Sequence, residues 1–123
     1  MTKIVQSYRD LVAWQKAMNL VTEIYRLSQK FPKEEMFGLI SQVRRAAVSV
    51  PSNIAEGHSR PSRKEFQYFL GNARGSLSEL ETQMMIGRNL DYLNEAELTN
   101  ILNIAAEVGR ILNGLMASIK NKI

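Results

Sequence analysis

Apolar residues recur every three or four positions along most of the chain, which is the spacing of one face of an α-helix. Four segments carry this pattern, over about residues 10–30, 33–57, 62–87 and 94–119. No segment alternates strictly between apolar and polar residues, as a half-buried β-strand would. Long helices joined by short connections pack as antiparallel neighbours. The pattern therefore predicts one all-α domain over residues 1–123, an antiparallel up-down-up-down four-helix bundle.

Residues that favour helix ends stand at the borders of these segments. Asp10 is expected to cap the first helix, because its carboxylate can accept hydrogen bonds from unpaired backbone amides. Pro32 is expected to end that helix, and the second helix is expected to begin near Lys33. Ser62 and Asn94 are the expected caps of the third and fourth helices.

Pro51 lies inside the apolar pattern of the second segment, which stays in phase on both sides of it. A proline within a helix removes one backbone hydrogen bond and crowds the preceding turn, so we expect a kink at Pro51 rather than the end of the helix. The side chains expected in the core are Leu11, Trp14, Met18, Val21 and Tyr25 beside Leu20, Ile24, Leu27 and Phe31 in the first helix; Met36, Ile40, Val43, Ala47, Val50 and Ile54 in the second; Phe66, Leu70, Ala73, Leu77, Leu80, Met84 and Gly87 in the third; and two adjoining rows from Leu98 and Ile101 in the fourth.

The composition limits the classes of protein to consider. A chain of 123 residues suits one domain with a core of its own. It contains no cysteine, which excludes disulfide frameworks and thiolate metal sites. No apolar run approaches the ~20 residues of a membrane span, and the first residues lack the apolar core of a signal peptide. We therefore expect a cytoplasmic protein without a membrane segment.

Candidate catalytic chemistry is sparse. The one histidine, His58, leaves little for acid–base catalysis, and it does not form the Glu-x-x-His pair that holds metals in helix bundles. Gly71 and Gly75 lie within a predicted helix rather than between a strand and a helix, so they do not make a phosphate-binding loop. We expect no catalytic residues, no metal site and no cofactor.

Charge is distributed unevenly, although the net charge of +4 is mild. From residue 42 to residue 74 there are six cations and two acids, whereas from residue 75 to residue 109 one cation faces six acids. The basic stretch suits an anionic partner, and the planar fork of arginine suits phosphate. The alternative is that these cations pair with acids of neighbouring helices or subunits. The candidate phosphate-binding residues are Arg44, Arg45, Arg60, Arg63, Lys64 and Arg74.

A row of small residues lies opposite the core stripe of the third helix. Each interior glycine costs about 1 kcal/mol relative to alanine, so glycines in such a row suggest close approach of a neighbouring backbone, by analogy with membrane helices. The fourth helix has a similar row, and heterologous contacts between unlike rows can close into rings. Close packing inside one protomer is the alternative. The candidate assembly residues are Tyr68, Gly71, Gly75, Ser78, Thr82 and Ile86 on the third helix and Ala106, Arg110, Gly114 and Ala117 on the fourth.

One long stretch carries a resemblance to a known family. It reads Gly38-Leu39-x-x-Gln42-x-Arg44-Arg45-Ala46-Ala47-x-Ser49-x-Pro51-x-Asn53-Ile54-Ala55-Glu56-Gly57, followed by Arg60, Glu65-Phe66, Phe69-Leu70 and Gly75-Ser76, and preceded by Tyr8-Arg9-Asp10-Leu11-x-x-Trp14-Gln15 and Phe31-Pro32. Over nearly the whole chain it resembles the bacterial 23S ribosomal RNA intervening-sequence proteins, or S23 proteins. The resemblance implies a four-helix bundle and carries over no catalytic residues.

A related branch, the accessory proteins of diversity-generating retroelements, forms pentamers with a basic outer surface that binds nucleic acid and a reverse transcriptase. The resemblance therefore implies a homo-oligomer, a pentamer in particular, and favours RNA as a partner. We expect a non-enzymatic, homo-oligomeric scaffold that binds structured RNA through its backbone phosphates. The alternative is a protein–protein adaptor whose partner is another polypeptide, for example a nucleic-acid enzyme. Salt would weaken the first interaction steeply and the second much less.

Overall fold

The structure, a computed structural model, describes residues 6–120 of the chain. These residues form four long α-helices and two short 3-10 helices, without a β-strand among them, which confirms the all-α four-helix prediction. The elements in chain order are η1 (Tyr8–Asp10), α1 (Val12–Ser28), η2 (Lys33–Glu35), α2 (Leu39–His58), α3 (Arg63–Asn89) and α4 (Glu95–Lys120).

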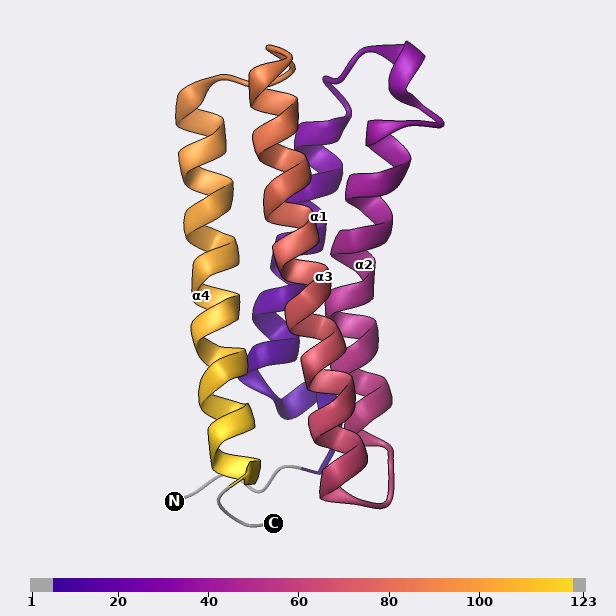
Figure 1. The fold of residues 1–123 in the computed structure, drawn as a ribbon, viewed down its shortest axis with the longest axis vertical. Helices are drawn as coiled ribbons and strands as arrows, with labels where there is room; N and C mark the ends of the chain where they lie inside the picture. Colours follow the sequence, from indigo (N-terminus) through magenta and orange to yellow (C-terminus); the bar gives the residue numbers. More distant parts are fainter. Residues whose placement is uncertain (1–5, 121–123) are drawn as a thin grey trace.

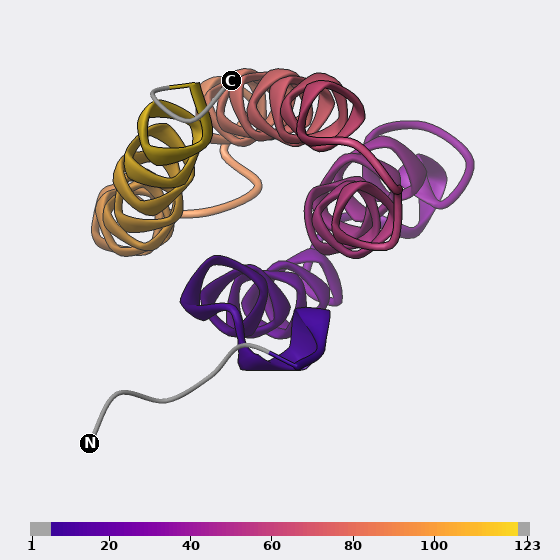
Figure 2. The same cartoon turned by 90° about the horizontal axis from the view of Figure 1, so that it is seen from below.

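The four helices lie side by side and run in alternating directions. In Figure 1 the chain ascends through α1, descends through α2, ascends through α3 and descends through α4. Seen along the helices in Figure 2, they surround a common centre in chain order, so that each helix packs against the helix before and after it and α4 returns to α1. The largest of these helix–helix contacts joins α2 and α3.

The core is formed by one buried row from each helix. The predicted stripe of α3 is confirmed from Leu70 to Gly87, whereas Phe66 at its start is half-buried. Of the two adjoining rows predicted for the core of α4, members of both form one buried row from Leu98 to Ile119, and the others are half-buried against the core. In α1 the prediction is wrong in part. The buried row there begins with Ala13 and Ala17 and continues through Leu20 and Ile24.

The larger side chains expected in the core of α1 lie further out. Met18 and Tyr25 are 41% and 39% exposed, and Leu11, Trp14 and Val21 are half-buried against the core. Met36, expected in the core of the second helix, is also exposed and precedes α2. The small side chains of Ala13 and Ala17 face the bundle centre, where four helices meet, and the bulkier row flanks them.

Two predicted helix starts are confirmed and two are wrong. Ser62 Oγ accepts a hydrogen bond from the Glu65 amide at 3.1 Å, and Asn94 Oδ1 accepts one from the Glu97 amide at 2.8 Å. Asp10 does not cap α1. Its carboxylate instead accepts from the Ser7 amide at 3.3 Å and closes the 3-10 turn η1.

The second helix begins later than predicted, because residues from Lys33 to Glu35 form the 3-10 turn η2 and α2 starts at Leu39. Glu35 Oε1 accepts from the Leu39 amide at 3.1 Å, and its Oε2 accepts from the Tyr92 hydroxyl at 2.8 Å. Both hydrogen bonds lower the pKa of the Glu35 carboxyl, and the one from the Leu39 amide has the larger effect. Glu35 therefore joins the start of α2 to the connection between α3 and α4.

Pro51 is buried inside α2, and the helix continues through it to His58. The expectation that this proline does not end the helix is therefore confirmed, while the size of any bend at Pro51 stays a prediction. Among residues 6–120, no helix is both long and apolar enough to cross a membrane.

Candidate nucleic-acid and assembly surfaces

The six candidate phosphate-binding cations lie in three places rather than in one patch. Arg44 and Arg45 belong to the first half of α2, whereas Arg60, Arg63 and Lys64 surround the connection from α2 to α3. Fifteen residues separate Arg45 from Arg60, which corresponds to about 22 Å along a helix. The sixth, Arg74, lies on the side of α3 that faces α4.

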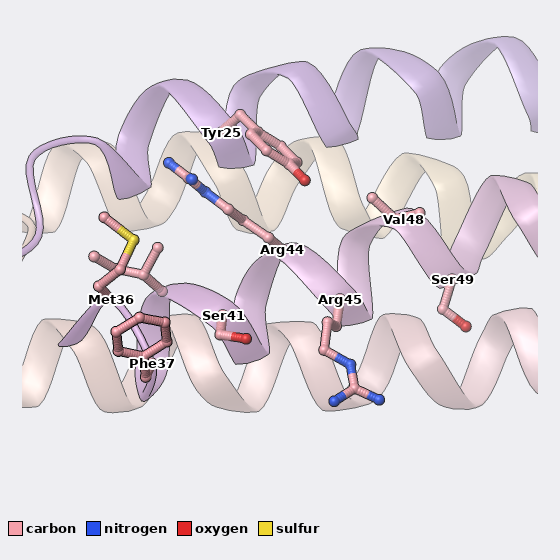
Figure 3. A pocket seen from close by; sticks show the side chains of 9 residues that line it. Tyr25, Met36, Phe37, Ser41, Arg44, Arg45, Val48 and Ser49 are labelled. Atoms are coloured by element: carbon pink, nitrogen blue, oxygen red, sulfur yellow. The ribbon is translucent and has the colours of Figure 1, made fainter.

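Arg44, Arg60 and Arg74 have partners within the protomer. Arg44 donates from Nε to Ser28 Oγ at 2.9 Å, and its guanidinium stacks on the Tyr25 ring, 4.5 Å from the centroid. Figure 3 shows Arg44 extending towards Tyr25, while Arg45 points away from it. Arg44 therefore joins α2 to α1.

Arg60 and Arg74 are also engaged. Arg60 forms an ion pair with Glu56 at 3.0 Å, and its guanidinium lies over the Phe69 ring at 5.0 Å. Arg74 donates from Nη1 to Asn113 Oδ1 at 3.2 Å. The alternative of internal ion pairing thus holds for Arg60, whereas the partner of Arg74 is a neutral amide.

Arg45 and Lys64 present their charge to solvent. Both side chains are exposed, and neither has an ion pair or hydrogen bond among the described residues. Arg45 lies on the outer side of α2, and Lys64 lies in the first turn of α3, next to the exposed Arg63. Of the six candidates, Arg45 and Lys64 can bind an outside anion without giving up an internal partner.

A polar groove runs along the outside of α2 and α3. It consists of two adjoining hollows of about 390 and 460 Å³ that share Ser49, Ser76 and Glu79. The hydroxyls of Ser49 and Ser76 are 2.8 Å apart across the groove. The other lining side chains, mostly amides, are Gln42, Arg45, Asn53, Asn72 and Gln83, with Ala46, Gly71 and Gly75 between them.

The glycines of the predicted assembly rows lie on open surface. A Cβ atom added at Gly71, Gly75 or Gly114 would have no atom within 4 Å, apart from the backbone of its own turn. Close packing inside the protomer, the alternative explanation for these three glycines, is therefore wrong. By contrast, a Cβ atom at Gly87 would lie 3.2 Å from Leu93 Cδ2.

The rest of these rows also lies outside the core. Tyr68, Ser78, Thr82 and Ile86 on α3 are exposed, as are Arg110 and Ala117 on α4, and Ala106 is half-buried. Thr82 donates its hydroxyl to the Ser78 carbonyl at 2.9 Å, so these two polar groups are satisfied within the helix. The rows thus form accessible surfaces on two adjacent helices.

A second groove, which the sequence did not reveal, lies between α1 and α2 and is mostly apolar (Figure 3). It has a volume of about 570 Å³, and its wall includes Tyr25, Met36, Ile40 and Val48. Phe37 stands at one end and is 97% exposed. The helical spacing predicts Tyr25, Met36 and Ile40 for the core, so their apolar character did not indicate a groove.

The rings of His58 and Phe66 pack nearly perpendicular to each other, with 5.7 Å between the centroids. Within residues 6–120, no three His, Cys, Asp or Glu side chains are grouped to hold a metal ion.

Burial raises the pKa of the Glu81 carboxyl on α3. Because the pKa is raised in the folded state, ionised Glu81 lowers the stability of the protein. This loss of stability disappears as the pH falls below the ordinary carboxyl value of 4.5. We therefore expect Glu81→Gln to raise the melting temperature at pH 7 and to change it little below pH 4.5. Thermal unfolding at both pH values measures this, and an equal gain at both would contradict the assignment to ionisation.

The sequence of this chain also matches a family model. The model is described as 23S rRNA-intervening sequence protein, and it covers residues 9–114. The chain belongs to this family.

The structure of this chain is similar to a crystal structure from Bacteroides thetaiotaomicron. That structure is of a protein with unknown function from the S23 ribosomal protein family. The TM-score is 0.79 at 22% sequence identity, and the match covers 85% of this chain and 98% of that one. At this identity the likeness shows a shared fold. No functionally curated protein matches the sequence.

Proposed function

We propose that the protein is a non-enzymatic, homo-oligomeric scaffold of the cytoplasm that binds structured RNA through backbone phosphates. The observation that carries the proposal is the pair of exposed cations, Arg45 and Lys64, which have no partner in the described protomer. Arg63 and the amides at the positive end of α3 lie next to Lys64, which favours an anion at this point. The family name, with its reference to 23S rRNA, supports an RNA partner.

Repetition around an oligomer would strengthen this binding. Arg45 is about 22 Å along the bundle from Arg60, and Lys64 follows Arg60 at the start of α3, so Arg45 and Lys64 would contact separate phosphates. Copies of Arg45 and Lys64 in a ring would bind one RNA at several points, and linked sites raise overall affinity well beyond that of one site. A pentamer is the assembly that the family resemblance suggests.

The test is the salt dependence of RNA affinity in Arg45→Ala and Lys64→Ala. Each lost phosphate contact should flatten the log–log plot of affinity against salt by about 0.9 for a duplex. Filter binding across a salt series measures this slope. Lys30→Ala is the matched control, because Lys30 is paired with Glu97 at 2.6 Å and is not one of the candidates.

We expect both variants to weaken binding most at low salt and the control to leave the slope unchanged. Unchanged slopes in both Arg45→Ala and Lys64→Ala, or an equal effect of Lys30→Ala, would contradict phosphate binding by these residues.

The apolar groove between α1 and α2 favours a second candidate function, that of an adaptor for another polypeptide. Phe37 and apolar side chains along the groove are exposed to solvent. Exposed apolar surface of this kind is typical of protein interfaces. Salt-insensitive capture of a protein, lost when Val48 is replaced by glutamate, would favour the adaptor over the RNA scaffold.

A further inference from the structure

We infer that the polar groove along the outside of α2 and α3 binds unpaired nucleotides of the RNA and that Glu79 favours a base with an exocyclic amino group. The inference rests on the proposed function and deepens it. Arg45 and Lys64 bind phosphates at the two ends of the groove, while bases that have left the duplex stack on Tyr68 and face Glu79.

The groove connects the two cations that carry the proposed function. Arg45 lines its first hollow, and Asn72 lines the second. Tyr68 and Lys64 lie one and two helical turns before Asn72 on the same side of α3, and all three side chains are exposed. The volumes of the two hollows, about 390 and 460 Å³, fall within the roughly 300–1,000 Å³ of small-ligand sites. The two phosphate contacts are therefore the ends of one continuous polar surface.

Two hydrogen-bond acceptors lie together in the first hollow. Glu79 is exposed and has no ion pair or hydrogen bond among the described residues. Gln83 lies one turn further along α3, and its Oε1 atom is buried without a hydrogen-bond partner within residues 6–120. A buried acceptor without a partner is costly. This part of the groove therefore suits a ligand that donates hydrogen bonds.

The same hollow contains opposite charges, Arg45 on α2 and Glu79 on α3, which do not form an ion pair with each other in the described part of the chain. A ligand between them needs an anionic group for the arginine and an N–H donor for the carboxylate. A nucleotide has both, because its phosphate is an anion and cytosine, adenine and guanine carry an amino group. Uracil has a carbonyl oxygen where cytosine has its amino group, so the two acceptors disfavour uracil.

Tyr68 provides a stacking surface next to Lys64. It is 65% exposed, and its ring packs nearly perpendicular to that of Phe69, with 5.2 Å between the centroids. Phe69 is in turn covered by the guanidinium of Arg60, which holds this cluster in place. An exposed aromatic ring beside cations is typical of sites for single strands, whose bases are free to stack on protein. The surface therefore suits unpaired nucleotides better than a duplex.

Gly71 and Gly75 keep the groove open between Tyr68 and Glu79. A Cβ atom at either glycine would have no atom within 4 Å, apart from the backbone of its own turn. A strand of RNA can therefore lie close to α3 along this stretch. Because the strand then covers the small-residue row of α3, contacts between copies of the chain must use other surfaces.

Three RNAs that share one duplex test the site: a blunt hairpin, the same hairpin with a single-stranded tail of cytidines, and the same hairpin with a uridine tail of equal length. Filter binding at one fixed salt concentration compares them. We expect the cytidine tail to raise affinity over the blunt hairpin by at least about fivefold, the effect of one stacked base. It should also bind about fivefold or more tightly than the uridine tail, which carries the same charge.

Tyr68→Ala should remove most of the gain from the cytidine tail and leave the affinity for the blunt hairpin unchanged, whereas Tyr68→Phe should keep the gain. Phe37→Ala is the matched control, because Phe37 is exposed but does not line the polar groove. Circular dichroism checks that each variant stays helical.

Glu79→Gln should reduce the preference for cytidine over uridine to about one, since an amide can donate to the uracil carbonyl as well as accept from cytosine. Glu34→Gln, on the exposed turn η2, should leave the preference unchanged. Equal affinity for the two tails in the wild type, or an equal loss with blunt and tailed hairpins in Tyr68→Ala, would overturn the inference. Failure of the wild-type protein to bind the blunt hairpin in a salt-dependent way would instead contradict the proposed function itself.

Discussion

Leu80→Ala is expected to lower the free energy of unfolding by about 2–5 kcal/mol, the range typical for removing a large aliphatic side chain from a packed core. Leu80 is 1% exposed and lies in the middle of α3, in the row that faces the bundle centre. The substitution removes apolar burial and leaves a cavity that the surrounding helices can fill only in part.

Urea denaturation measures the loss, with Leu90→Ala as the matched control. Leu90 follows α3 and is 50% exposed, so the same substitution there should cost less than about 1 kcal/mol. A loss below about 1 kcal/mol for Leu80→Ala would mean that this row is not the core of the bundle.

Gly57→Ala is expected to destabilise the bundle, because the added methyl group has no room between α2 and α3. A Cβ atom at this position would lie 2.7 Å from Cβ of Phe69 and 3.0 Å from Cδ1 of Phe66. The contact with Phe69 Cβ cannot be relieved by rotating a flexible side-chain end, so α2 and α3 must move apart. Overpacking of this kind costs about 1–3 kcal/mol.

Gly109→Ala is the control for this prediction, since a Cβ atom there would only meet Leu77 at 3.4 Å, an ordinary contact. Alanine is the better helix former by about 1 kcal/mol, so Gly109→Ala should be neutral or stabilising. If chemical denaturation gave Gly57→Ala the same free energy of unfolding as Gly109→Ala, this would contradict the close approach of α2 to α3 at Gly57.

The sequence predicted those features that depend on neighbours along the chain. Helical periodicity identified four helices, and Ser62 and Asn94 were recognised as caps because the side chain and its amide partner are three residues apart. Helical spacing predicted Asp10 as the cap of the first long helix, whereas the structure uses its carboxylate to close the 3-10 turn that precedes this helix.

Features that depend on contacts between helices could not be predicted in the same way. The row containing Trp14 and Met18 has larger apolar side chains than Ala13 and Ala17, so size favoured a row that flanks the centre over the two alanines that face it. Which row faces inward depends on how closely the other three helices approach.

The candidate sites illustrate the same limit. The partners of Arg44 are Ser28 and Tyr25, on another helix, so no local spacing indicates that this arginine is engaged while Arg45 beside it is not. The small-residue row of α3 could be assigned from the sequence because it depends only on helical spacing. That this row borders a polar groove required the position of α2.

The most direct test of the account is the binding of a structured RNA hairpin to the wild-type protein over a series of salt concentrations. A scaffold that binds phosphates should bind at low salt and lose affinity with a steep negative log–log slope, about −0.9 for each phosphate contacted in a duplex. Absence of binding at low salt, or an affinity that salt leaves unchanged, would contradict RNA binding through the phosphate backbone.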